Sequence, residues 1–339
     1  MKYTGKLRLT LAGVLMAGVA FGATVAQAAP IKIIMSDDSA KVSLKGQTFE
    51  KFAEEIRNRL GDKVVVDLQH SSTLFAQSEQ VQGLQLNAVN FIAPTTGTYA
   101  SLAKGMNAFN LPFLLDTPEK FSAAMKDETI RNMFVPALEA KNVEPVAFWI
   151  NGPRVLGYTG TKAVLTPADI AGMKIRVQSA PVYVKTFAAV GANPVSVNWG
   201  EAPTALQTGV IDGAEVTPNA WKGSGMYEMI DHLTLTNHMY SYYMVGTSKS
   251  WWDGLPDDVR TGIADALKAA TDWNIENGLK MNSDDVEFMR QKGVEIHTLD
   301  DAQHAQWVSK MKPVWKELGE PLVGKEVMTR LKEIAGAAD

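Results

Sequence analysis

The segments IKIIM (residues 31–35), KVVVDL (63–68) and VNFIA (89–93) decide the fold, because each is a short apolar run typical of a buried strand. Between the first two, apolar residues recur at helical spacing as far as Gly61, a typical helix stop. A polar helix is predicted around residues 77–86. This β-α-β-α-β order predicts an α/β fold with a parallel sheet and helices on its faces.

Ligands of open α/β sheets bind at the carboxyl ends of the strands. The residues directly after the three predicted strand ends are Ser36 and Asp37, residues 71–77 and residues 94–96. Topology alone therefore makes these residues candidates for a binding site.

The chain continues with a second series of predicted strands, at residues 146–150, 154–158, 173–177 and within 209–215, and a later strand is predicted at 239–247. Asn151-Gly152-Pro153 interrupts this series early and is the best candidate for a crossing between two domains. From Pro256, at a predicted first helical position, to about Lys292 the pattern is helical. At about 1.5 Å per residue this helix exceeds about 45 Å, so we expect it to run along both domains.

The composition is typical of a folded protein with two domains. The chain has 339 residues, of which 46% are hydrophobic and 21% charged, and its formal net charge is −4. It has no Lys/Arg-rich run, so no nucleic-acid partner is expected. It also has no cysteine, which excludes disulfides, zinc-thiolate sites and thiol nucleophiles.

Residues 1–28 have the pattern of a secretory signal peptide. Positive charges precede an uncharged stretch at residues 9–26, and Ala26-Gln27-Ala28 is a typical site for cleavage near Ala28/Ala29. The alternative is a transmembrane anchor, but several Gly and Thr residues dilute the apolar stretch. We therefore expect a bacterial-type protein exported to the periplasm.

The sequence contains no recognisable catalytic signature. It has no Walker A loop, G-x-G-x-x-G, G-x-S-x-G or H-E-x-x-H motif. Its five histidines show no metal-ligand spacing, so we expect no catalytic residue, metal or cofactor. The rival hypothesis is an exported hydrolase or lyase with an acid/base pair such as Glu79 or Glu201 with His70.

Arg176 is the strongest candidate for a binding residue. In the predicted strand at 173–177 the apolar residues share one face, which places Arg176 on the other face, at the carboxyl end. Ser179 and Pro181 resemble the N-cap and first turn of a following helix. A guanidinium beside a helix N-terminus suits an anion, because its fork donates two parallel hydrogen bonds. The alternative is an ion pair with a neighbouring Asp or Glu.

A longer pattern resembles a known family. Its motifs occur in the order SSTL (71–74), DIAGMKIR (169–176), GANP (191–194), Glu201 with ALQTG (205–209), IDGAE (211–215) and LPDD (255–258). This pattern closely resembles the DctP-type substrate-binding proteins of TRAP (tripartite ATP-independent periplasmic) transporters, and the resemblance covers the whole chain after the predicted signal peptide.

The resemblance implies a two-domain periplasmic binding protein with a ligand cleft between the domains. Such a protein is not an enzyme: it closes on a small organic acid and delivers it to the membrane subunits of the transporter. Domain I would comprise residues 29–151 plus about 240–277, and domain II residues 152–239 plus about 278–339. A sensory receptor of the same fold is the alternative role.

The resemblance also assigns roles to individual residues. Arg176 would make a two-pronged salt bridge to the ligand carboxylate, Arg154 would be a second arginine of the site, and Trp199 would pack on the ligand. Alternatives are a surface role for Arg154, core packing for Trp199 and a helix cap for Ser179. The remaining candidates for the cleft are Ser36, Asp37, Gln77, Thr95, Ser179, Val216, Thr217 and Tyr242.

Two departures from the sialic-acid-binding members bear on the ligand. Val216-Thr217-Pro218 follows Glu215, where those members have Asn-Pro, and Pro94-Thr95-Thr96 replaces a segment with an acidic residue. Both changes remove polar contacts that a sugar acid needs. Trp149 and the tyrosines of the strand at 239–247 offer apolar or aromatic walls. We therefore expect an acid that is smaller than sialate or partly apolar or aromatic.

Overall fold

The computed structural model describes residues 1–2 and 29–337. The predicted signal peptide therefore lies almost wholly outside the described residues. Within them, no helix is both long enough and apolar enough to cross a membrane.

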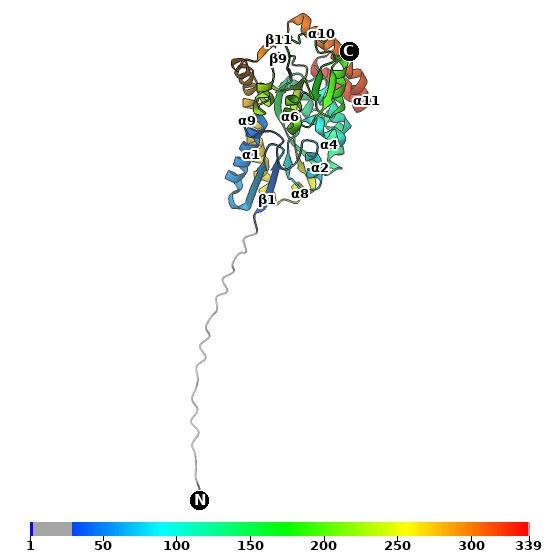
Figure 1. Cartoon of the computed structure of the whole chain (residues 1–339). Helices are drawn as coiled ribbons and strands as arrows, with labels where there is room; N and C mark the ends of the chain where they lie inside the picture. The colour runs from blue at the N-terminus through cyan, green and yellow to red at the C-terminus, as the bar shows by residue number, and fades with distance from the viewer. Residues whose placement is uncertain (3–28, 338–339) are drawn as a thin grey trace.

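The chain forms two β-sheets, one toward each end of the molecule (Figure 1). The first sheet has the order β2 (Val64–Gln69), β1 (Ile31–Ser36), β3 (Phe91–Ile92), β10 (Tyr240–Ser248) and β4 (Val143–Pro153). The second has the order β11 (Glu295–Thr298), β9 (His232–Leu235), β5 (Val155–Tyr158), β8 (Gly213–Val216), β6 (Lys174–Val177) and β7 (Asn193–Ser196). The predicted parallel pairing of β1 with β2 and β3 is confirmed.

Helices connect and cover these strands. The α-helices are α1 (Leu44–Leu60), α2 (Gln80–Gln85), α3 (Pro118–Lys126), α4 (Glu128–Glu139), α5 (Pro181–Ala189), α6 (Ala202–Gln207), α7 (Pro218–Gly223), α8 (Lys249–Asp253), α9 (Asp257–Gln291), α10 (Asp301–Met311), α11 (Glu320–Val323) and α12 (Lys325–Ala335). Short turns are η1 (Gly61–Lys63), η2 (Thr96–Ser101), η3 (Lys104–Asn110), η4 (Trp199–Glu201), η5 (Met226–Met229) and the π-helical η6 (Trp315–Gly319).

Helix α1 is defined at both ends by its sequence and packs in the core beside the first sheet. The Ser43 side chain caps its first turn by accepting a hydrogen bond from the Gly46 N–H, and Gly61 ends it with φ at +49°. Its apolar face is buried, and the ring centroids of Phe49 and Trp149 lie 5.0 Å apart in an edge-to-face arrangement. Trp149 therefore belongs to the core rather than to a ligand wall.

The predicted long helix is confirmed as α9, whose 35 residues span about 52 Å. It packs against α1 and β4, and also against α7 and β11, so it runs along both sheets. It begins at Asp257, with Pro256 at the N-cap position rather than at the first helical position. The helix predicted around 77–86 is shorter than expected, because α2 begins only at Gln80 and leaves Gln77 in the preceding turn.

The chain crosses from the first sheet to the second between Pro153 and Val155. Residues 146–150 were expected in the second series, but they lie in β4 and pair with β10 of the first sheet. Asn282 of α9 fixes this crossing by donating to the Asn151 carbonyl at 2.9 Å. Gly152 has φ at +124°, and a Cβ there would lie 2.5 Å from Asn282 Nδ2, so the position requires glycine.

The C-terminal helices do not stay with the second sheet. Helix α12 packs against α3 and α4, and α11 packs against η3, all of which precede β4 in the chain. Residues 320–335, expected in domain II, therefore pack against elements of the part expected to be domain I, and the domain boundaries stay a prediction.

Candidate functional site

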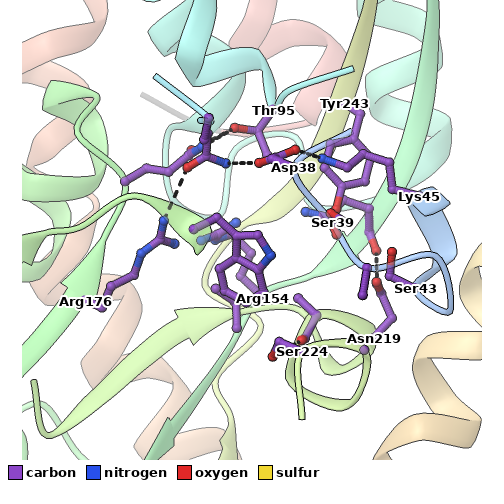
Figure 2. Close-up of a pocket in the computed structure, with 18 residues that line it drawn as sticks. Asp38, Ser39, Ser43, Lys45, Thr95, Arg154, Arg176, Asn219, Ser224 and Tyr243 are labelled. Carbon is purple, nitrogen blue, oxygen red and sulfur yellow. Dashed lines mark hydrogen bonds and ion pairs between the residues drawn. The ribbon is translucent and has the colours of Figure 1, made fainter. Parts of the chain in front are cut away.

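A cavity of about 40 Å³ lies between the two halves of the protein, each of which is built around one of the two sheets. Residues from both sheets border it. Its lining comprises Asp38, Ser39, Ala40, Ser43, Lys45, Gln77, Thr95, Asn151, Arg154, Arg176, Gln178, Trp199, Val216, Asn219, Ala220, Gly223, Ser224 and Tyr243. Figure 2 shows Arg176 on one side of this cavity and Lys45, Ser43 and Asn219 on the other.

Arg176 is a buried cation that forms no ion pair with a carboxylate of the described residues. Its orientation follows from the alternation of side chains along β6, and the residue is only 2% exposed. Its Nε donates to the Val197 carbonyl at 2.9 Å, and its Nη2 donates to Gln77 Oε1 at 3.3 Å. The Trp199 ring lies 5.4 Å from the guanidinium carbon. Burial lowers the pKa of Arg176 to about 10, because it outweighs the charges of Glu215 and Asp38, which act in the opposite direction without contacting the guanidinium.

Arg154 is equally buried but has a full counter-ion. Its Nε and Nη2 donate to the two carboxylate oxygens of Glu215 at 2.5 and 2.7 Å, and its guanidinium lies 5.0 Å from the Tyr183 ring. Burial alone would raise the pKa of Glu215, but Arg154 and His238 outweigh burial and lower it. The pair is therefore ionised and mutually neutralised.

The wall opposite Arg176 is a hydrogen-bonded chain of charged groups. Lys45 contacts Asp38 and lies 3.4 Å from Asp37, and it is 4.5 Å from the Tyr243 ring. Gln77 Nε2 donates to Asp38 at 2.8 Å, so Gln77 links this wall to Arg176. Burial alone would lower the pKa of Lys45, but the two carboxylates outweigh burial and raise it.

Gln77 is thus one bridge between the two halves of the protein, and a second bridge lies beside it. Thr95 follows β3 of the first sheet, and Gln178 follows β6 of the second. The Thr95 hydroxyl donates to Gln178 Oε1 at 2.8 Å, and both residues are buried. With the halves joined by both bridges, the structure has the geometry of a closed cleft.

The structure brings six of the eleven predicted site residues to the cavity: Arg154, Arg176, Trp199, Gln77, Thr95 and Val216. The other five, Ser36, Asp37, Ser179, Thr217 and Tyr242, do not line it. Three of these five are buried just behind the lining, where they support it or the strands. Asp37 contacts Lys45, the Thr217 hydroxyl donates to Asn151 Oδ1 at 2.8 Å, and Ser36 is fully buried in β1.

Ser179 and Tyr242 are placed differently from the prediction. Ser179 is exposed, and the N-cap of α5 is Ala180, so Ser179 does not cap the helix. The Tyr242 ring stacks on Phe121 at 3.5 Å in the core, while its neighbour Tyr243 faces the cavity. Successive side chains of β10 point to opposite faces, which is why only one of the two reaches the site.

Most of the wall opposite Arg176 cannot be found by the rule that ligands bind directly after strand ends. Asp38, Ser39, Ser43 and Lys45 lie between β1 and the first turn of α1, further along the chain than Ser36 and Asp37. Asn219 and Ser224 lie in and just after α7. The signal available for Asn219 was Pro218, which marks a helix start directly after the predicted strand end.

The acid/base pair of the rival hydrolase hypothesis does not form. His70 contacts Asp37 at 2.9 Å and Glu50 at 3.1 Å, and neither Glu79 nor Glu201 lies within hydrogen-bond distance of it. None of His70, Glu79 and Glu201 lines the cavity.

Comparison with known proteins identifies the family. Residues 35–321 match the profile of DctP, the bacterial extracellular solute-binding proteins of family 7. The chain belongs to this family. The C4-dicarboxylate-binding periplasmic protein DctP of Rhodobacter capsulatus is 33% identical over 309 residues, which cover 91% of this chain and 92% of the relative. The DctP of Vibrio cholerae is 32% identical over 82% of this chain and 84% of the relative.

A solved structure agrees with this assignment. A TRAP periplasmic solute-binding protein of Shewanella oneidensis with bound succinate superimposes with a TM-score of 0.86 and 30% identity, over 91% of this chain and 100% of the other. The resemblance stated above and its two-domain α/β fold are therefore confirmed. Members of this family are solute-binding receptors, and the named relatives are periplasmic.

Proposed function

We propose that this DctP-family protein is the periplasmic receptor of a TRAP transporter, which binds a small organic acid in the cavity and delivers it to the membrane subunits. The observation that carries the proposal is Arg176, a buried cation without a carboxylate partner among the described residues. Burying such a charge is costly, and an anionic ligand removes that cost by forming charge-assisted hydrogen bonds.

The size of the cavity favours a short acid. The cavity has a volume of only about 40 Å³. That space suits an acid of a few carbon atoms better than a sugar acid. It supports the prediction that the ligand is smaller than sialate.

The chemistry of the lining favours a polar ligand over an aromatic one. The lining also includes Ser39, Ser43 and Ser224, which carry hydroxyls, and Asn219. Ser43 also marks the N-terminus of α1, whose dipole favours negative charge. A diacid could place one carboxylate on Arg176 and the other among these hydroxyls. With the C4-dicarboxylate-binding relatives, this makes four-carbon dicarboxylates the first class to test.

Calorimetric titration of residues 29–339 tests the proposal, after unfolding and refolding to remove any copurified ligand. Succinate, succinamate and glucuronate should be compared, because succinamate replaces one carboxylate by a neutral amide and glucuronate is larger. We expect succinate to bind most tightly and glucuronate least tightly. Absence of binding by a wider acid panel to the correctly folded protein would contradict the receptor proposal.

The site is tested with Arg176→Ala, with Arg59→Ala as a control because Arg59 is a surface residue of α1 paired with Glu55. Arg176→Ala should weaken binding by about 10- to 100-fold, since hydrogen bonds to charged groups contribute about 1.5–3 kcal/mol. Arg59→Ala should bind like wild type. Equal affinity of the two variants would reject Arg176 as the anchor. Uptake of the bound acid by cells with and without this protein tests delivery.

A further inference from the structure

Two histidines and a glutamate meet on the outer strands of the second sheet, away from the cavity. β11 pairs in parallel with β9, and this register sets Glu295 opposite His232. His297 is two residues beyond Glu295, so the three side chains share one face of the sheet. The other face carries Leu233 and Ile296, which pack in the core.

The distances between the donor atoms match a metal-binding site. His232 Nδ1 lies 3.1 Å from His297 Nε2 and 3.4 Å from Glu295 Oε2. Ligands about 2.0–2.1 Å from a tetrahedral metal are about 3.3 Å from one another. The three donor atoms lie within 4.8 Å of one another, so one ion can reach all three.

The surroundings of His232 orient it as a metal ligand. Its Nε2 is 3.1 Å from the Gly160 carbonyl, which can only accept a hydrogen bond, so Nε2 carries the proton. Nδ1 therefore has a free lone pair directed toward the metal-binding atoms of Glu295 and His297. Gly160 is itself held in place, because its N–H donates to Asp231 at 2.8 Å. The Tyr158 ring stacks on the imidazole at 5.3 Å, and His232 is buried.

We propose that His232, Glu295 and His297 form a zinc-binding site on the edge of the second sheet. Two imidazoles and one carboxylate suit Zn²⁺ and other borderline-soft divalent ions, whereas Ca²⁺ and Mg²⁺ prefer oxygen ligands. A fourth position is open to water, because the Glu295 side chain is 69% exposed. Bound zinc would join β11, which directly follows the long helix α9, to β9.

The proposal does not depend on the identity of the acid ligand. β11 is separated from β6, which carries Arg176, by β9, β5 and β8, a distance of about 19 Å across the sheet. Zinc binding should therefore leave the affinity for the acid unchanged.

The test uses the mature chain with any affinity tag removed and with metals stripped by chelator. We expect one Zn²⁺ per chain in a calorimetric titration, and a rise in Tm of several degrees at about 100 times the Kd. Ca²⁺ and Mg²⁺ should produce neither. Bound Co²⁺ should show the visible absorption bands of a tetrahedral site. No stoichiometric zinc binding, or equal binding of Ca²⁺, would overturn the proposal.

Variants locate the site. Glu295→Gln is on the surface and should fold normally, and His297→Gln removes a half-buried ligand; His304→Gln, an exposed histidine on α10, is the matched control. Removing a hydrogen-bond partner of a metal ligand lowers metal affinity by about 10- to 100-fold. Removing a ligand itself should lower zinc affinity by more than that. Zinc affinity unchanged in Glu295→Gln and His297→Gln would place any bound zinc elsewhere and reject the site.

Discussion

Arg154 and Arg176 are both 2% exposed and border the same cavity, yet their surroundings differ in one respect. Arg154 has a carboxylate on two of its nitrogens, whereas Arg176 has a backbone carbonyl and the amide oxygen of Gln77. The pKa values reflect this difference. That of Arg176 is lowered by burial to about 10, whereas for Arg154 the charge of Glu215 outweighs burial and raises the pKa.

A binding protein can hold two buried arginines with different tasks. A buried ion pair with satisfied hydrogen bonds stabilises the site's geometry and is already neutral before ligand arrives. A buried cation without a counter-ion destabilises the ligand-free closed state and favours an anion that restores neutrality. We therefore propose that the same residue type serves the fold at Arg154 and the ligand at Arg176.

We expect the two arginines to differ most in how much each contributes to the free energy of unfolding. Arg154→Ala leaves the buried Glu215 without its counter-ion, so we expect the free energy of unfolding in urea to fall by about 3–5 kcal/mol. Arg176→Ala removes a charge without a carboxylate partner and should cost far less, or even stabilise the ligand-free protein. The double variant Arg154→Met/Glu215→Leu should recover most of the loss. Similar losses for Arg154→Ala and Arg176→Ala would show that the two arginines do not differ in this way.

The position of Arg176 could be predicted from the sequence because it depends only on neighbouring residues. Strand alternation over five residues and the helix that follows were enough to place it at the carboxyl end of a strand. The β-α-β-α-β order likewise rests on neighbouring segments, and it predicted the parallel pairs of β1 correctly.

The partner of Arg154 could not be predicted in the same way. Glu215 is 61 residues away, and the two meet only because β5 and β8 pair antiparallel in the second sheet. The choice between Tyr242 and Tyr243 failed for a related reason. Alternation separates their faces, but only the packing of Phe121 on Tyr242 decides which face meets the cavity. His232 and His297 are likewise united by pairing of β9 with β11, which no local spacing reveals.

We expect a smaller effect on affinity when a hydrogen bond that closes the cleft around Arg176 is removed. Thr95→Val keeps the shape of the side chain but removes its hydrogen bond to Gln178 across the cleft. A hydrogen bond of this kind contributes about 0.5–1.5 kcal/mol, so affinity for the acid should fall by about two- to tenfold. Ser101→Ala, on the exposed end of η2, is the control. Calorimetry showing equal affinity for both variants would mean that this bridge does not contribute to closure.

The smallest effect concerns how the wall opposite Arg176 is neutralised. Asp37 and Asp38 share Lys45, and His70 supplies a further cation at 2.9 Å from Asp37. Burial alone would lower the pKa of His70, but its hydrogen bonds and charge interactions with Asp37 and Glu50 outweigh burial and raise it above 6.5. The neutralisation of Asp37 therefore depends on pH, unlike that of Glu215 by Arg154.

The sign of the pH effect follows from proton linkage. Because the folded protein binds the His70 proton more tightly than the unfolded chain, His70 adds to the free energy of unfolding fully below about pH 6.5. That contribution is lost as the pH rises through the raised pKa of the folded state. Urea unfolding at a series of pH values should show this loss in wild type and in the control His304→Gln, and a flatter profile in His70→Gln. Identical profiles for all three proteins would mean that Lys45 alone balances the two aspartates, and the wall opposite Arg176 would then be as insensitive to pH as the Arg154–Glu215 pair.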